Sequence, residues 1–212
     1  MQNDVSLRLA KRIWEVVEKE FESGELFEKV SPITKELLRF WFCEPFVSQR
    51  QFNFHKGQKQ SILNIIYLHE VLRINNVLEI YEQVAPDLLL ESDLFGAKET
   101  RNSLKESRYD LPKYLVKMAT GTGKTWVMHA LLIWQILNAK NEEEKSGRFT
   151  KNFLIVAPGL IVYDRLLDAY KGRLSENGDG RDFSTNDFVR NKDLFVPENY
   201  REEVFSFIQN NT

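Results

Sequence analysis

The chain of 212 residues contains one cysteine, Cys43, and so cannot form an internal disulfide. The absence of disulfides is typical of reducing compartments and favours a cytoplasmic protein. Cys43 lies in the aromatic run Phe40-Trp-Phe-Cys-Glu-Pro-Phe46. We therefore expect it to be a small packed side chain rather than a reactive thiol.

Long hydrophobic runs are also missing. The longest mostly apolar stretch, Trp126–Leu137, contains His129 and Gln135 and is too short to span a bilayer. The first residues include Asp4 and no apolar core of a signal peptide, so we expect no leader.

An excess of basic charge is lacking too. Lysine and arginine number 29 against 31 acidic residues, which gives a net charge of -2 and excludes a basic footprint over the whole surface. A local basic groove for nucleic acid stays open, because charge acts where it lies. His55, His69 and His129 are scattered and show no zinc-ligand spacing, so we expect His129 to pack in a core. The four tryptophans stand in apolar contexts and are expected to pack in the same way, with base stacking as the alternative.

Helical periodicity dominates the first part of the chain. The spacing predicts helices over residues 5–21, from Ser31-Pro32 to about Phe42, over 57–73 and over 76–84. We expect residues 1–50 to form an N-terminal helical extension. Residues 91–110 are polar and predict a loop.

The pattern changes after residue 113. The apolar runs Tyr114–Met118 and Phe153–Ala157 predict strands, and Thr125–Leu137 and Leu160–Tyr170 predict the helices that follow them. This alternation predicts an α/β fold with a parallel sheet flanked by helices. Residues 141–151 and 171–198 are expected to be mostly loop.

The most informative stretch is Met118-Ala-Thr-Gly-Thr-Gly-Lys-Thr125. It matches the phosphate-binding P-loop G-x-x-x-x-G-K-[ST] except that Met118 replaces the first glycine. In such a loop the backbone N–H groups from about Gly121 to Thr125 surround the phosphates, and Gly121 and Gly123 permit the tight turn. Lys124 supplies a cation for the β- and γ-phosphates, and the Thr125 hydroxyl a ligand for Mg²⁺. We therefore predict that Thr120, Gly121, Thr122, Gly123, Lys124 and Thr125 bind ATP with Mg²⁺.

Two other interpretations of this loop exist. A dinucleotide fingerprint G-x-G-x-x-G is excluded, because Trp126 stands at the third glycine position. A glycine loop that precedes a helix by chance is disfavoured by the apolar run before it and the apolar helix after it.

Gln58 is a candidate contact for the base. A glutamine amide pairs with adenine N6 and N7 at once, although an isolated glutamine is more often a surface residue. It stands some 60 residues before the P-loop, at the start of the third predicted helix.

Three motifs together resemble superfamily 2 helicases of the DEAD/DEAH type. Gly57-Gln-Lys-Gln-Ser-Ile62 resembles their glutamine motif, Met118–Thr125 resembles their P-loop variant, and Phe153–Leu166 resembles the motif known as Ia. The order and spacing of the motifs agree over about residues 51–170. The sequence is most similar to the restriction (Res) subunits of type III restriction–modification enzymes. The similarity rests on the tripeptides Ala-Pro-Gly and Asp-Arg-Leu within motif Ia and on the later Asp193-Leu-Phe-Val-Pro197.

The resemblance implies a DNA-dependent ATPase and a RecA-like first motor lobe over residues 51–212. It implies backbone contacts to DNA from Pro158, Gly159 and Arg165, although a surface salt bridge is an equal alternative for Arg165. It further implies DNA translocation coupled to an endonuclease and a modification (methyltransferase) subunit as a partner.

Some family features are absent. No Asp-Glu dipeptide occurs in the chain, whereas the family uses one to hold Mg²⁺ and position the attacking water. The arginine or aromatic residue that the family has before its glutamine is replaced by His55 and Gly57, and Gly159 replaces a threonine. We therefore expect an N-terminal piece of a longer enzyme that binds ATP but does not hydrolyse it alone.

Two functions of other classes remain as alternatives. A P-loop kinase of a small metabolite would use Lys124 and Thr125 in the same way, but kinases usually begin with their P-loop. A non-catalytic nucleotide-binding module would use the helical extension as its working surface. Stimulation of ATP hydrolysis by nucleic acid separates the motor from both.

Overall fold

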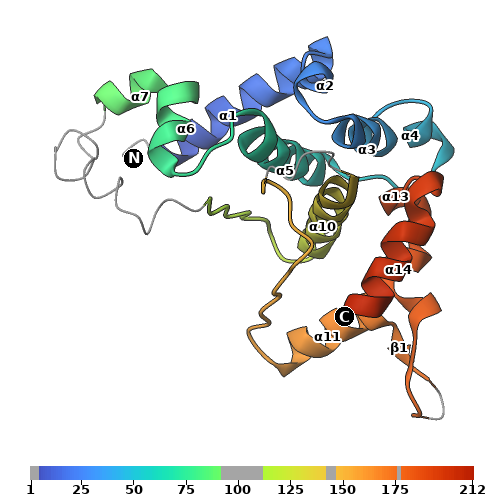
Figure 1. Ribbon diagram of the computed structural model, residues 1–212. Helices are drawn as coiled ribbons and strands as arrows, with labels where there is room; N and C mark the ends of the chain where they lie inside the picture. Colours follow the sequence, from blue (N-terminus) through green and yellow to red (C-terminus); the bar gives the residue numbers. More distant parts are fainter. Residues whose placement is uncertain (1–4, 92–111, 142–146, 176–177) are drawn as a thin grey trace. The chain divides into compact units, whose positions relative to one another are not determined.

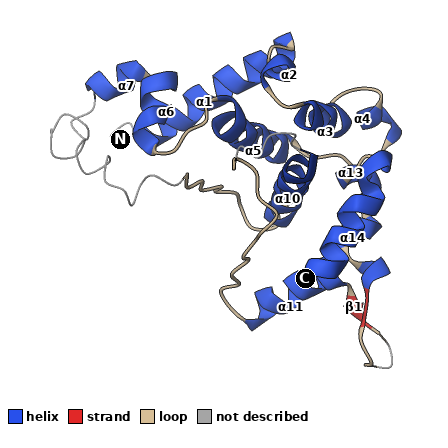
Figure 2. Ribbon diagram, viewed as in Figure 1, coloured by secondary structure: helices blue, strands red, loops and turns tan. Residues whose placement is uncertain are grey.

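The computed structural model describes residues 5–91, 112–141, 147–175 and 178–212. The chain divides into two compact units, each assembled from two segments: Met1–Val30 with Lys56–Lys124, and Ser31–His55 with Thr125–Thr212. Helices make up most of the described regular structure in both units (Figures 1 and 2). None of the helices in the described part of the chain is long and apolar enough to cross a membrane.

The first unit consists of helices followed by an irregular segment that leads to the P-loop. Its elements are α1 (Val5–Ser23), α2 (Leu26–Lys29), α5 (Lys56–Ile66), the π-helical turn η1 (Tyr67–Val71), α6 (Val77–Val84) and α7 (Pro86–Glu91). Helix α1 contacts α2, α5 and α6. Its apolar stripe buries Leu9, Ile13 and Val17, as the periodicity predicts.

Polar contacts fix the ends of these helices. The Asn76 side chain caps α6 by accepting hydrogen bonds from the backbone N–H groups of Leu78 and Glu79. The Tyr67 hydroxyl donates to Glu20 Oε1 at 3.0 Å, and Lys29 Nζ lies 2.7 Å from the same oxygen. The predicted helices of this unit are confirmed, with the third ending in the π-helical turn.

Helix α10 (Lys124–Asn141) begins at the last residue of the first unit and continues in the second, and many of its residues are buried. The other elements are α3 (Pro32–Phe42), α4 (Phe46–Gln49), α11 (Leu160–Lys171), β1 (Arg173–Leu174), β2 (Arg181–Asp182), η3 (Phe183–Thr185), α12 (Asp187–Arg190), α13 (Lys192–Phe195), η4 (Glu198–Tyr200) and α14 (Arg201–Asn211). Ser31 caps α3 by accepting from Thr34 N–H, and Pro32 fills the first turn, as predicted.

Aromatic side chains and a buried polar network form the core of the second unit. Trp41 and Trp134 are almost fully buried, and Trp41 Nε1 donates to the Phe195 carbonyl at 2.9 Å. The Thr34 hydroxyl accepts from Trp134 Nε1 and from Asn138 Nδ2, both at 3.0 Å. Each buried indole N–H therefore has an acceptor, which removes the cost of an unpaired donor.

The parallel sheet predicted from the sequence is not present among the described residues. Tyr114–Met118 and Phe153–Ala157 lie in the segments without regular structure, shown as tan trace in Figure 2, and their alternate side chains Leu115, Leu154 and Val156 are 92%, 89% and 78% exposed. The prediction of strands at these positions is wrong for this structure. An apolar run becomes a strand only when a neighbouring strand pairs with its N–H and C=O groups, and these runs have no such neighbour in the described chain.

The prediction of mostly loop over residues 171–198 is also wrong in part. Strands β1 and β2 form an antiparallel pair in which Arg173 faces Asp182 and Leu174 faces Arg181, and three short helices follow. Local side-chain bonds build these turns: Asn186 accepts from Val189 N–H at 2.8 Å and caps α12. The predicted loops at 91–110 and 141–151 fall largely outside the described residues.

Candidate nucleotide-binding site

The P-loop residues form a tight turn that ends at the first residue of α10. Gly121 and Gly123 have φ angles of 81° and 74°, in the left-handed region that glycine adopts without strain. The Thr122 hydroxyl donates to the Ala119 carbonyl at 2.7 Å and closes the turn. These bonds and glycine conformations are what a loop needs to bend sharply into the N-terminus of a helix.

Lys124 folds back onto this turn. Its Nζ donates to the carbonyl oxygens of Met118 and Ala119, at 3.1 and 2.9 Å, while the side chain stays exposed. An ammonium held by two carbonyls inside a loop lies where a polyphosphate would meet it, and an exposed side chain leaves these partners at little cost. Thr125 follows in the first turn of α10 and is half-buried.

Gln58 belongs to the same unit and reaches this loop. It is 4% exposed, and its Nε2 donates to the Gly123 carbonyl at 3.3 Å. Gln58 lies in the first turn of α5, so this bond joins the start of α5 to the phosphate-binding turn.

The residues expected to contact nucleic acid belong to the second unit: Pro158 and Gly159 directly precede α11, and Arg165 lies in the middle of that helix. Pro158, Gly159 and Arg165 are all exposed, and Gly159 is the residue that precedes the helix. Arg165 forms no ion pair with any residue that the structure describes, so the salt-bridge alternative for it is not seen there. The side chains of Leu160 and Ile161 beside them are also exposed, at 80% and 72%.

The predicted core position of His129 is confirmed. The ring is fully buried against Tyr170, Phe188 and Phe195, and its Nε2 lies 3.3 Å from Asp187 Oδ2. Burial lowers the pKa of His129, and the Asp187 carboxylate opposes that shift in part. The neutral ring donates from Nε2 to Asp187, and Nδ1 has no hydrogen-bond partner among the described residues. No local pattern in the sequence points to Asp187 as the partner of His129, because the two residues are 58 positions apart.

Among the residues that the structure describes, no three histidine, cysteine or acidic side chains gather as a metal site.

Comparison with protein families identifies the class of this chain. The family described as type III restriction enzyme, res subunit, matches residues 51–210. The chain therefore belongs to the family of type III restriction enzyme res subunits and carries a helicase-like ATPase domain. The resemblance inferred from the motifs is confirmed. No curated protein and no solved structure matches the chain.

Proposed function

We propose that this chain supplies the ATP-binding part of the first motor lobe of a cytoplasmic, DNA-dependent ATPase, the restriction subunit of a type III restriction–modification system. One observation carries the proposal. In a member of the res-subunit family, the lysine of the P-loop is folded into a turn with two left-handed glycines at the start of a helix. In the complete enzyme, ATP hydrolysis would drive translocation along DNA and lead to endonucleolytic cleavage.

The parts of the site have distinct tasks. Backbone N–H groups of Thr120–Thr125 and the N-terminus of α10 would hold the phosphate oxygens. Lys124 would exchange its two carbonyl partners for the β- and γ-phosphates, and Thr125 would hold Mg²⁺, which neutralises charge on those phosphates. Gln58 would fix the adenine while its bond to Gly123 keeps the amide at the loop.

The exposed turn before α11 supports the DNA part of the proposal. A helix N-terminus presents unpaired N–H groups, and Pro158 and Gly159 leave those of α11 uncovered by a bulky side chain. Arg165 would add a cation to the same surface. The modification subunit as a partner rests on the family alone.

The exposed apolar runs support the fold part. We propose that Tyr114–Met118 and Phe153–Ala157 become strands of a parallel sheet in the complete motor lobe, with residues 1–50 as its helical extension. Large exposed side chains such as Leu115 and Leu154 are costly in water and are typical of surfaces that another element covers. Fast amide hydrogen exchange of both runs in the full-length protein would contradict this part.

The experiment that tests the function is a phosphate-release assay on the full-length protein with and without double-stranded DNA. We expect ATP hydrolysis that DNA stimulates and that K124A abolishes. Turnover of ATP that ignores DNA but depends on a small acceptor molecule would support the kinase instead. Binding without turnover under any condition would support the non-catalytic module.

A further inference from the structure

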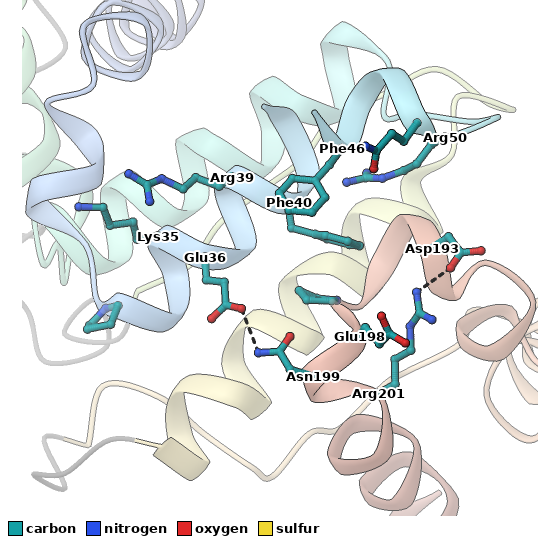
Figure 3. Close-up of a pocket in the computed structure, with 13 residues that line it drawn as sticks. Lys35, Glu36, Arg39, Phe40, Phe46, Arg50, Asp193, Glu198, Asn199 and Arg201 are labelled. Carbon is teal, nitrogen blue, oxygen red and sulfur yellow. Dashed lines mark hydrogen bonds and ion pairs between the residues drawn. The ribbon is translucent and has the colours of Figure 1, made fainter. Parts of the chain in front are cut away.

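A cavity of about 1060 Å³ opens in the second unit, lined by α3, α4 and the segment from α13 to the start of α14 (Figure 3). Its volume is slightly above the usual range for small-molecule sites, roughly 300–1,000 Å³. None of the P-loop residues Thr120–Lys124 lines it. The cavity is therefore a separate candidate for ligand binding.

Arg50 is the unusual residue of this cavity. Its guanidinium carbon lies 4.2 Å from the centre of the Phe40 ring, so the cation is stacked on an aromatic face. Both terminal nitrogens, Nη1 and Nη2, are buried and have no hydrogen-bond partner among the described residues. Burial lowers the pKa of Arg50 to about 10, against the opposing effect of Asp193, so the group remains charged at neutral pH.

Three acids line the cavity with Arg50: Glu36, Asp193 and the exposed Glu198. Glu36 and Asp193 already accept hydrogen bonds from other groups. Asp193 Oδ1 accepts from Arg201 at 2.6 Å, and Glu36 Oε1 accepts from Asn199 at 2.9 Å (Figure 3). The other oxygen of Glu36 accepts from the Tyr200 hydroxyl at 2.7 Å. A buried cation without hydrogen bonds is expensive for a folded protein, and the ordinary remedy is an anion in contact with it. Asp193 acts on the Arg50 cation through its charge, but no described residue accepts a hydrogen bond from Nη1 or Nη2.

We propose that this cavity binds a small organic anion, with a carboxylate or phosphate group on the fork of Arg50 and an apolar body against Phe40 and Phe46. A guanidinium presents two parallel N–H groups that match the two oxygens of such a group, and stacking on Phe40 holds the fork in one orientation. Lys35 and Arg39 line the same cavity and add positive charge on the α3 side. Phe46 is 38% exposed at the mouth, where an apolar ligand would cover it.

The test is a titration of the purified chain with phenyl phosphate and with benzoate, followed by calorimetry. We expect saturable binding of at least one of them, weakened at least about tenfold by R50Q, since a pair of hydrogen bonds to a charged group is lost. R50K keeps the positive charge but loses the two parallel N–H groups of the guanidinium. Its affinity for the probes should lie between those of wild type and R50Q. D193N removes the opposing carboxylate and should tighten binding. The probe that binds with the higher affinity shows whether the site prefers a phosphate or a carboxylate.

Further variants separate this site from others. K124A should leave binding of both probes unchanged, and R50Q should leave binding of ATP with Mg²⁺ unchanged. Equal binding by wild type and R50Q, no saturable binding by wild type, or loss of binding in K124A would each overturn the proposal. If a short single-stranded DNA displaces the probe, and R50Q also weakens binding of that DNA, the ligand is a nucleic-acid phosphate. That result would overturn the proposal of a small organic anion. If thermal unfolding shows that R50Q does not fold, the affinities of R50K and D193N for the probes test the proposal. Affinities equal to that of wild type in both variants would then overturn it.

Discussion

Gln58 is buried at the start of α5 with its amide on the phosphate-binding turn, and this position makes its role testable. Adenine presents an N6 donor where guanine presents an O6 acceptor, so an amide oxygen placed there favours adenine by one hydrogen bond. We expect Q58A to reduce the preference for ATP over GTP by roughly two- to tenfold, the value of one such bond. Competition titrations with both nucleotides measure it.

Q60A, a substitution two residues further along α5, is the matched control and should leave the preference unchanged. If Q58A weakens ATP and GTP by the same factor, the residue holds the Gly123 carbonyl and does not contact the base.

His129 makes stability depend on pH. Because burial lowers its pKa, the unfolded chain binds the proton first as the pH falls through the ordinary value of 6.5. The free energy of unfolding therefore keeps the full contribution of the neutral His129 ring above about pH 6.5. Below that pH it falls, by up to about 1.4 kcal/mol per pH unit for one proton. Urea unfolding at several pH values between about 5.5 and 7.5 measures this slope.

The His129→Phe variant should remove that part of the slope, and His55→Gln, at an exposed position, should leave it in place. A slope that is the same in all three proteins would mean that another group causes it.

At the scale of elements, the β1–β2 hairpin depends on Gly172. This residue has a φ of 86°, and a Cβ atom there would overlap the Asp182 carbonyl oxygen and lie 2.6 Å from its carbonyl carbon. We expect G172A to lower the free energy of unfolding by more than about 2 kcal/mol, because backbone strain and overlap add. G178A is the control: its φ is 73° but no atom lies within 4 Å of the added group, so only about 1 kcal/mol of strain is expected. Similar losses in both variants would show that the contact with Asp182 is relaxed.

The helices could be predicted from the sequence because their information is local. The apolar stripe of α1, the Ser31-Pro32 start of α3 and the Asn76 cap of α6 all lie within the residues that form them. The strands were predicted wrongly because an apolar run such as Phe153–Ala157 says nothing about whether a neighbour pairs with it.

The two sites differ in the same way. The P-loop is one continuous stretch whose residue types state its chemistry, so Lys124 and both glycines could be assigned in advance. The cavity around Arg50 is lined by two segments, residues 32–50 and 193–201, whose nearest lining residues, Arg50 and Asp193, are 143 positions apart. No spacing in the sequence links these segments.

For the whole molecule, we expect the chain of 212 residues to show no appreciable ATP hydrolysis. Phosphoryl transfer to water needs a group that orients the water and a cation on the far side of the γ-phosphate, and the latter alone is worth roughly 10³–10⁵ in rate. The P-loop supplies neither, and the chain has no Asp-Glu pair. Phosphate release by this chain, assayed with and without DNA beside the full-length protein, measures it. Robust turnover that K124A abolishes would reveal a carboxylate that takes this role.

The central claim is that the turn at Thr120–Thr125 binds ATP with Mg²⁺ through Lys124, and calorimetric titration of the chain tests it directly. We expect saturable binding that K124A weakens at least about tenfold, because a charge-assisted contact worth about 1.5–3 kcal/mol is lost. K117A removes an exposed lysine just before the loop and should leave the affinity unchanged. Equal affinity of wild type and K124A, or equal losses in K124A and K117A, would contradict the claim.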